Sequence, residues 1–159
     1  MNPMLIFLSL STGIYLIFAT IWDLKSREIY TFPCNILAVM WAIFAFVKGS
    51  VDVYEMVAYV VCFVALYIGF NVTKAWGAGD SDLFLLFGSV YLAHIEKTIT
   101  LFDISGQCIA MALVLLISAS IGLVEAKIRK KELKRDSSIA IAPGYAMVII
   151  GVIVGGFIS

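Results

Sequence analysis

Apolar residues in this chain gather into six long stretches that are separated by short polar intervals. The stretches cover residues 3–22, 32–47, 54–73, 81–95, 98–124 and 139–158. A helix needs about 20 mostly apolar residues to cross the hydrocarbon core of a bilayer, and roughly 17–25 are used. The pattern therefore predicts an all-α, polytopic membrane protein with about six transmembrane helices, of which the second and fourth are short.

The composition agrees with a lipid bilayer as the surrounding solvent. Apolar residues make up 62% of the chain, charged residues make up 14%, and the mean hydropathy is +1.04. Soluble domains are about half apolar and a quarter charged, so a soluble fold of this size would leave much apolar surface in water. Neither an internal repeat nor a second domain is evident, and residues 1–159 are expected to form a single membrane-embedded domain.

Lysine and arginine are distributed unevenly between the two sets of loops. Two lie in the loops after the second and fourth spans, Lys48 and Lys97, and nine lie in the others. The nine are Lys25, Arg27, Lys74, Lys127, Arg129, Lys130, Lys131, Lys134 and Arg135. Cytoplasmic loops carry the excess of basic residues, so the basic loop 125–138 is expected in the cytoplasm and both termini outside. The expected location is the inner (cytoplasmic) membrane, with the first span retained because it lacks the basic start of a signal peptide.

Two aspartates stand at the ends of predicted spans that face the same side. Asp23 closes the first span, and Asp80 opens the fourth within the sequence Gly77-Ala78-Gly79-Asp80. Ionisable groups at membrane depth cost roughly 3 kcal/mol each on insertion scales and usually mark function. Two neighbouring carboxyl groups share a proton, so one can activate water while the other protonates a carbonyl oxygen. The pattern permits hydrolysis by general acid–base catalysis at the cytoplasmic boundary.

The glycines before Asp80 have two interpretations. Gly77 and Gly79 lack Cβ atoms, so they allow a positive φ and the close approach of a substrate strand. Alternatively, the tetrapeptide is a loop-to-helix turn in which Asp80 caps the fourth helix, which is the commoner use of such a spacing. Asp82 suits either a cap or the first turn of that helix, where a carboxylate matches the helix dipole.

Other catalytic chemistries have less support in the sequence. His94 is the single histidine and is expected on the opposite side of the membrane. No Ser-His or Cys-His arrangement and no His-Glu-x-x-His zinc motif is present. The cysteines are isolated from one another, so they form no metal or redox motif. No metal site, cofactor or nucleic-acid partner is predicted.

These motifs together resemble those of the type IV prepilin peptidases, the membrane aspartyl proteases with a Gly-x-Gly-Asp motif. Residues 23–29 are similar to the Asp-x-x-x-Arg-x-Ile stretch of the short members, and Ile141-Ala142-Pro143-Gly144 is similar to the start of the family's last helix. The likeness implies that Asp23 and Asp80 are catalytic and that Gly77, Gly79 and Arg27 belong to the motifs that a substrate approaches. It also implies a peptidase-only enzyme that cleaves the basic leader of a prepilin-like membrane protein, just before its apolar helix.

The chain departs from the family pattern in two places. Tyr30 and Thr31 follow Ile29, where short members continue with Pro-Asn, and Asp82 stands where the family often has lysine. The second departure removes a cation beside the site, which bears on substrate preference more than on hydrolysis. The alternative function is a non-enzymatic transporter or pilus-assembly factor whose acidic residues bind protons or cations. That function would place the aspartates near the middle of the membrane.

Overall fold

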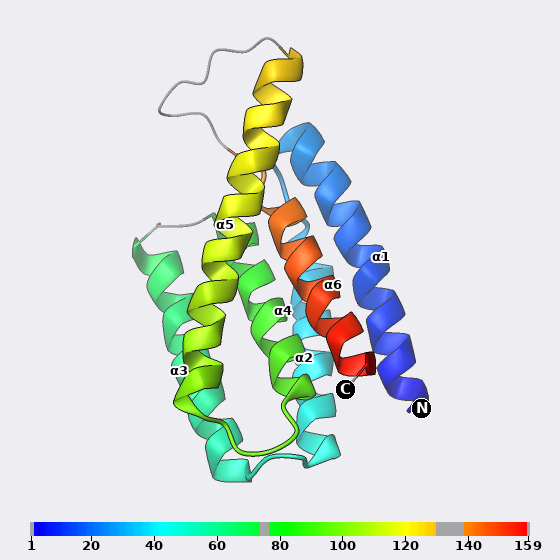
Figure 1. Cartoon of the computed structure of the whole chain (residues 1–159), viewed down its shortest axis with the longest axis vertical. Helices are drawn as coiled ribbons and strands as arrows, with labels where there is room; N and C mark the ends of the chain where they lie inside the picture. Colours follow the sequence, from blue (N-terminus) through cyan, green and yellow to red (C-terminus); the bar gives the residue numbers. More distant parts are fainter. Residues whose placement is uncertain (1, 74–76, 130–138, 159) are drawn as a thin grey trace.

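The chain forms an up-and-down bundle of helices in the computed structural model, which describes residues 2–73, 77–129 and 139–158 (Figure 1). The described residues contain six helices and no strand. They are α1 (Pro3–Ser26), α2 (Thr31–Lys48), α3 (Val53–Thr73), α4 (Ala78–His94), α5 (Leu101–Arg129) and α6 (Ala142–Ile158). The helices α1, α2, α3 and α5 are long and apolar enough to cross a membrane, and α6 is a shorter apolar helix. The predicted all-α membrane fold is confirmed.

Helix boundaries differ from the prediction at the two ends of the basic loop. The fifth helix continues to Arg129, so residues 125–129 form a helical extension of the fifth span, which is one of the two forms, helical extension or loop, that the sequence allows for 125–138. Glutamate, alanine and lysine favour helix there, and Glu125 is held by an ion pair described below. Residues 130–138, with four of the predicted basic side chains, lie outside the described residues, as does Lys74. The last helix begins at Ala142, three residues later than expected.

The inner helix of the bundle is α4. It packs against α2, α3 and α6, and buried side chains occur all around it, among them Leu83, Phe84, Leu86, Phe87 and Val90. The other helices carry their large exposed apolar side chains on outward faces, where a bilayer covers them. At the contact with α3, a Cβ atom on Gly88 would overlap the ring of Phe63, so the glycine allows the two helices to approach.

The beginning of α4 lies at the same end of the bundle as the end of α1, the start of α6 and the last turns of α5 (Figure 1). The chain begins and α6 ends at the other end of the bundle. This arrangement brings residues from the first, fourth, fifth and sixth helices together at one end, and that end holds both aspartates.

Candidate active site

A cavity of about 410 Å³ lies between the end of α1, the connection to α2 and the start of α4. Every site residue predicted from the sequence lines it, and the full lining consists of Asp23, Arg27, Glu28, Ile29, Tyr30, Thr31, Gly77, Gly79, Asp80 and Ile139. The two aspartates, which are far apart in the sequence, therefore face one shared space. The lining combines three acidic residues with two glycines.

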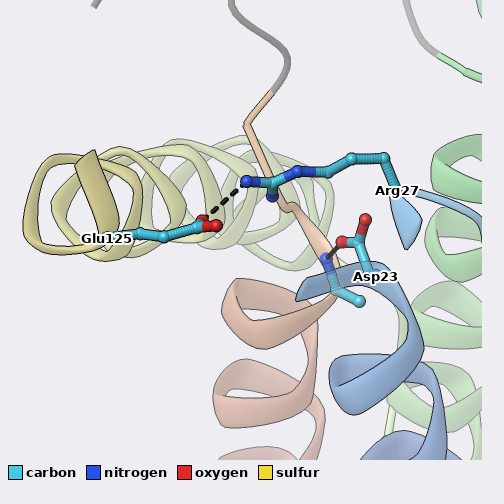
Figure 2. Close-up of polar contacts among 4 residues, drawn as sticks. Asp23, Arg27 and Glu125 are labelled. Carbon is cyan, nitrogen blue, oxygen red and sulfur yellow. Dashed lines mark hydrogen bonds and ion pairs between the residues drawn. The ribbon is translucent and has the colours of Figure 1, made fainter. Parts of the chain in front are cut away.

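Asp23 is buried and is hydrogen-bonded to the start of the last helix. It is 5% exposed, and its Oδ2 atom accepts a hydrogen bond of 2.9 Å from the backbone N–H of Ala142. Figure 2 shows this contact, with the other carboxylate oxygen pointing away from it. Ala142 is the first residue of α6, where the N–H groups have no partner within the helix and the helix dipole favours negative charge. Asp23 therefore supplies an acceptor for an N–H group that the start of α6 leaves unpaired.

Asp80 lies in the first turn of α4, ahead of the apolar part of that helix. Its pKa is raised to about 6, chiefly by burial and in addition by the nearby Asp23 carboxylate, while a hydrogen bond from the backbone of Gly77 acts in the opposite direction. Gly77, and not Asp80, is the N-cap residue of α4, so the tetrapeptide is a loop-to-helix turn in which the Asp80 side chain of the first turn is bonded back to the Gly77 backbone. The two aspartates therefore lie in different surroundings, and the raised pKa lets Asp80 keep its proton to a higher pH than an ordinary carboxyl group does.

The positive φ expected at the glycines is absent, and the residue that approaches Gly79 closely belongs to the same chain, so the approach of a substrate strand stays a prediction. Gly77 has a φ of −64°, and Gly49 is the positive-φ glycine among the described residues. A Cβ atom on Gly79 would lie 2.8 Å from the Cβ of Ile29, which is closer than real side chains come. The closely packed partner is thus the connection between α1 and α2 of the same chain. Gly79 and Ile29 bring the two sequence motifs into direct contact.

Arg27 links the end of α1 to α5. Its Nη2 atom lies 2.6 Å from the Oε2 of Glu125, and Figure 2 shows the guanidinium on the same side of α1 as the Asp23 carboxylate. Glu125 was not among the site residues predicted from the sequence. The feature that could have indicated it is an acidic residue at the end of the fifth span, directly before a run of basic residues.

Asp82 does not line the cavity with Asp23 and Asp80. It is 4% exposed, and the hydroxyl of Tyr67 on α3 donates a hydrogen bond of 2.9 Å to its Oδ1. The Asn35 side chain is hydrogen-bonded to it as well. The residue that replaces the family's lysine is therefore part of the packing between α2, α3 and α4. His94, at the other end of α4, is equally remote from the cavity.

An apolar groove runs from the cavity along α1 and α2. It has a volume of about 600 Å³ and extends from Tyr30 and Trp22 toward Ser11 and Leu37. Tyr30 lines both the groove and the cavity. Its position is fixed by a hydrogen bond of 3.0 Å from the Tyr15 hydroxyl to its backbone oxygen and by an edge-on contact with Trp22, whose ring centroid is 5.2 Å away.

The described residues contain no group of three or more His, Cys, Asp and Glu side chains that could hold a metal ion. In the comparisons with known proteins, no family model, no curated protein and no solved structure matches the chain. The likeness to prepilin peptidases thus consists of the three sequence motifs. Two of these motifs line the cavity, and the third supplies the Ala142 amide that binds Asp23.

Proposed function

We propose that this protein is a membrane aspartyl endopeptidase that cleaves the leader of a prepilin-like substrate at the cytoplasmic membrane boundary. The observation that carries the proposal is the pairing of Asp23 and Asp80 in one cavity at the end of the bundle. Carboxyl groups in such different surroundings divide the roles of acid and base between them. The family resemblance supplies the substrate class, and the cavity supplies a place for the reaction.

The reaction needs no covalent intermediate. Ionised Asp23 takes a proton from a water molecule, the water oxygen bonds to the scissile carbonyl carbon, and protonated Asp80 donates its proton to the carbonyl oxygen. In the second half, Asp23 gives its proton to the departing amide nitrogen as the C–N bond breaks. The hydroxyl proton of the intermediate returns to Asp80 as the new carboxyl group forms. Both aspartates then have their starting protonation states.

The groove along α1 and α2 gives the substrate's apolar helix a place next to the cavity. Its lining is almost entirely apolar, and Phe18, Tyr30 and Phe32 are largely exposed along it. A substrate helix in the groove would end near Tyr30, from which an extended leader can enter the cavity. The basic leader would remain in the cytoplasm for the same reason that basic loops do.

The position of the aspartates favours a hydrolase over a transporter. A carrier of protons or cations would hold its acidic groups near the membrane midplane, among broken helices. Asp23 lies close to the end of α1, Asp80 lies in the first turn of α4, and both helices are continuous within the described residues.

The test is cleavage of a single-span substrate with a basic leader, a glycine and an apolar helix, reconstituted with the protein in liposomes. Asp23→Asn and Asp80→Asn should each lower kcat by a factor of about 10³ or more, and the double variant should lose little more because the pair acts as a unit. Asp52→Asn is the matched control, since this aspartate accepts a hydrogen bond from Tyr54 N–H at the opposite end of the bundle. Processing by Asp80→Asn, or failure of the wild-type protein to process any of a panel of such leaders, would contradict the proposal.

A further inference from the structure

The guanidinium group of Arg27 is only partly paired within the protein. Its Nη2 atom is held by Glu125, whereas its Nη1 atom is buried and has no hydrogen-bond partner among the described residues. A buried donor without an acceptor costs about 1–3 kcal/mol, and a guanidinium has five N–H donors in a fixed fork. The free nitrogen is thus suited to an acceptor that the chain itself does not supply.

The backbone at Arg27 also departs from ordinary geometry. Arg27 has a φ of 59° and is the positive-φ residue other than glycine in the described ranges. It ends α1 in the left-handed conformation, with its N–H bonded to the backbone oxygen of Asp23 at 3.0 Å. A residue with a side chain pays for this conformation with strain of about 1–3 kcal/mol, and such residues cluster at functional sites. The bend places the guanidinium next to the cavity rather than along the axis of α1.

The charges around Arg27 indicate the kind of acceptor that fits. Arg27 is the one cation in the lining described above, and Asp23, Glu28 and Asp80 line the same space. Glu125 already neutralises the guanidinium, so a further carboxylate would meet a net negative site and be repelled. A neutral acceptor with a strong dipole meets no such repulsion, and the backbone carbonyl of an extended peptide is that kind of group.

We propose that Nη1 of Arg27 binds a backbone carbonyl oxygen of the substrate beside the scissile bond and holds the peptide extended across Asp23 and Asp80. This inference rests on the proposed function and assigns Arg27 as a substrate-binding residue. The contact exists in the bound substrate and in the transition state alike, because the flanking carbonyl does not change charge. Loss of such uniform binding raises KM and leaves kcat nearly unchanged.

The decisive variant is Arg27→Lys, with Glu125→Gln as the matched control. A lysine ammonium can keep the ion pair with Glu125, but it cannot present a second nitrogen in a fixed fork. Arg27→Lys should raise KM roughly tenfold, with kcat within about threefold of wild type, because a charge-assisted hydrogen bond is lost. Glu125→Gln keeps an acceptor for Nη2 and leaves Nη1 in place, so its KM should stay within about threefold of wild type. Arg27→Gly, which suits the left-handed backbone, should resemble Arg27→Lys in KM and thereby separates the side chain from the bend.

Three results would overturn this inference while leaving the proposed function intact. They are an unchanged KM in Arg27→Lys, an equal rise of KM in Glu125→Gln, and loss of the Arg27→Lys effect when acidic residues near the cut of the substrate are replaced by amides. The third result would make the ligand a carboxylate. A binding assay with fluorescent, uncleaved substrate in the Asp80→Asn background tests the same contact without catalysis, and Arg27→Lys should raise Kd there by the same factor. Absence of cleavage by the wild-type protein would instead reject the proposed function.

Discussion

The Asp23 carboxylate accepts a hydrogen bond from the backbone amide of Ala142, a residue 119 positions further along the chain. One aspartate thereby serves two purposes, because it caps α6 and it faces the cavity. The two purposes can be separated by substitution, since capping requires only an acceptor oxygen whereas the proposed base requires a carboxylate.

Asp23→Asn should therefore remove activity and preserve stability. The asparagine side-chain oxygen can accept the Ala142 N–H, so the unfolding midpoint in detergent should remain close to that of wild type. Asp23→Leu leaves the N–H buried without a partner and should cost about 1–3 kcal/mol. Unfolding of both variants, followed by circular dichroism, checks this. Equal destabilisation by asparagine and leucine would mean that the negative charge, and not the hydrogen bond, holds α6.

Activity should decline as the pH rises through about 6. Asp80 has a raised pKa of about 6, and as the proposed acid it must be protonated to donate to the carbonyl oxygen. Below that pH the donor is present, and above it kcat/KM should fall by about tenfold per pH unit, as the fraction of protonated acid does. The check is a pH–rate profile in liposomes with equal pH on both sides. A rate that does not change between about pH 5 and pH 8, a range that includes the pKa of Asp80, would exclude Asp80 as the acid.

Gly79→Ala should lower activity strongly although it adds a single methyl group. The new Cβ would lie 2.8 Å from the Cβ of Ile29, and that atom cannot move unless the connection between α1 and α2 shifts. A shift of about 1 Å at a reacting centre can cost roughly 10²-fold in rate. Gly69→Ala on α3 is the control, because nothing lies within 4 Å of a Cβ atom there. Cleavage rates for the two variants at equal expression decide the matter, and equal effects would show that the Gly79–Ile29 contact does not position the site.

Asp82→Asn should retain substantial activity. The asparagine oxygen can still accept the hydrogen bond from Tyr67, which joins α3 to α4 in the wild-type protein. Asp82→Lys, which introduces the residue that prepilin peptidases often have at the corresponding place, should destabilise the protein because it buries a cation against α2 and α3. Cleavage and thermal unfolding of both variants test this difference. An inactive but stably folded Asp82→Asn protein would show that Asp82 takes part in the chemistry.

A bulky residue in place of the substrate glycine before the cut should block processing, whereas changes deep in the substrate helix should matter less. The aspartates lie at the end of the bundle, so the scissile segment must be extended there, and glycine leaves a helix most readily. A processing assay on leader variants measures this. Efficient cleavage in the middle of the apolar helix, with no dependence on the glycine, would indicate an intramembrane protease of a different kind.

The sequence predicted the bundle well because lipid imposes a simple pattern of long apolar stretches and narrow charged intervals. The pairing of Asp23 with Asp80 followed from counting spans and basic residues, since helices that alternate in direction return every second loop to one end. The start of α6 was misplaced because residues 139–141 are as apolar as the helix itself. Their place is set by tertiary contacts, including the Ser118 hydroxyl donating to the Ile141 oxygen at 3.3 Å.

The sequence pattern could not predict contacts between residues that are far apart in the chain. Nothing near Asp23 indicates that its partner is the backbone of Ala142, since any amide in the chain has the same donor. The left-handed backbone at Arg27 was equally hidden, because arginine rarely adopts it. The glycine motif was associated with the approach of a substrate strand, and the fold shows instead that Ile29 of the same chain packs against Gly79.

The enclosure of α4 has a consequence for how the protein is made. This helix has 17 residues and carries both Asp80 and Asp82 near its start, and ionisable groups at membrane depth are costly. Its insertion into lipid alone is therefore unfavourable, and α2, α3 and α6 must be present to shield it. Because α6 follows the other five described helices in the chain, Asp80 reaches its final surroundings only after all of them have been made. A nascent chain that lacks α6 therefore also lacks the Ala142 amide that binds Asp23.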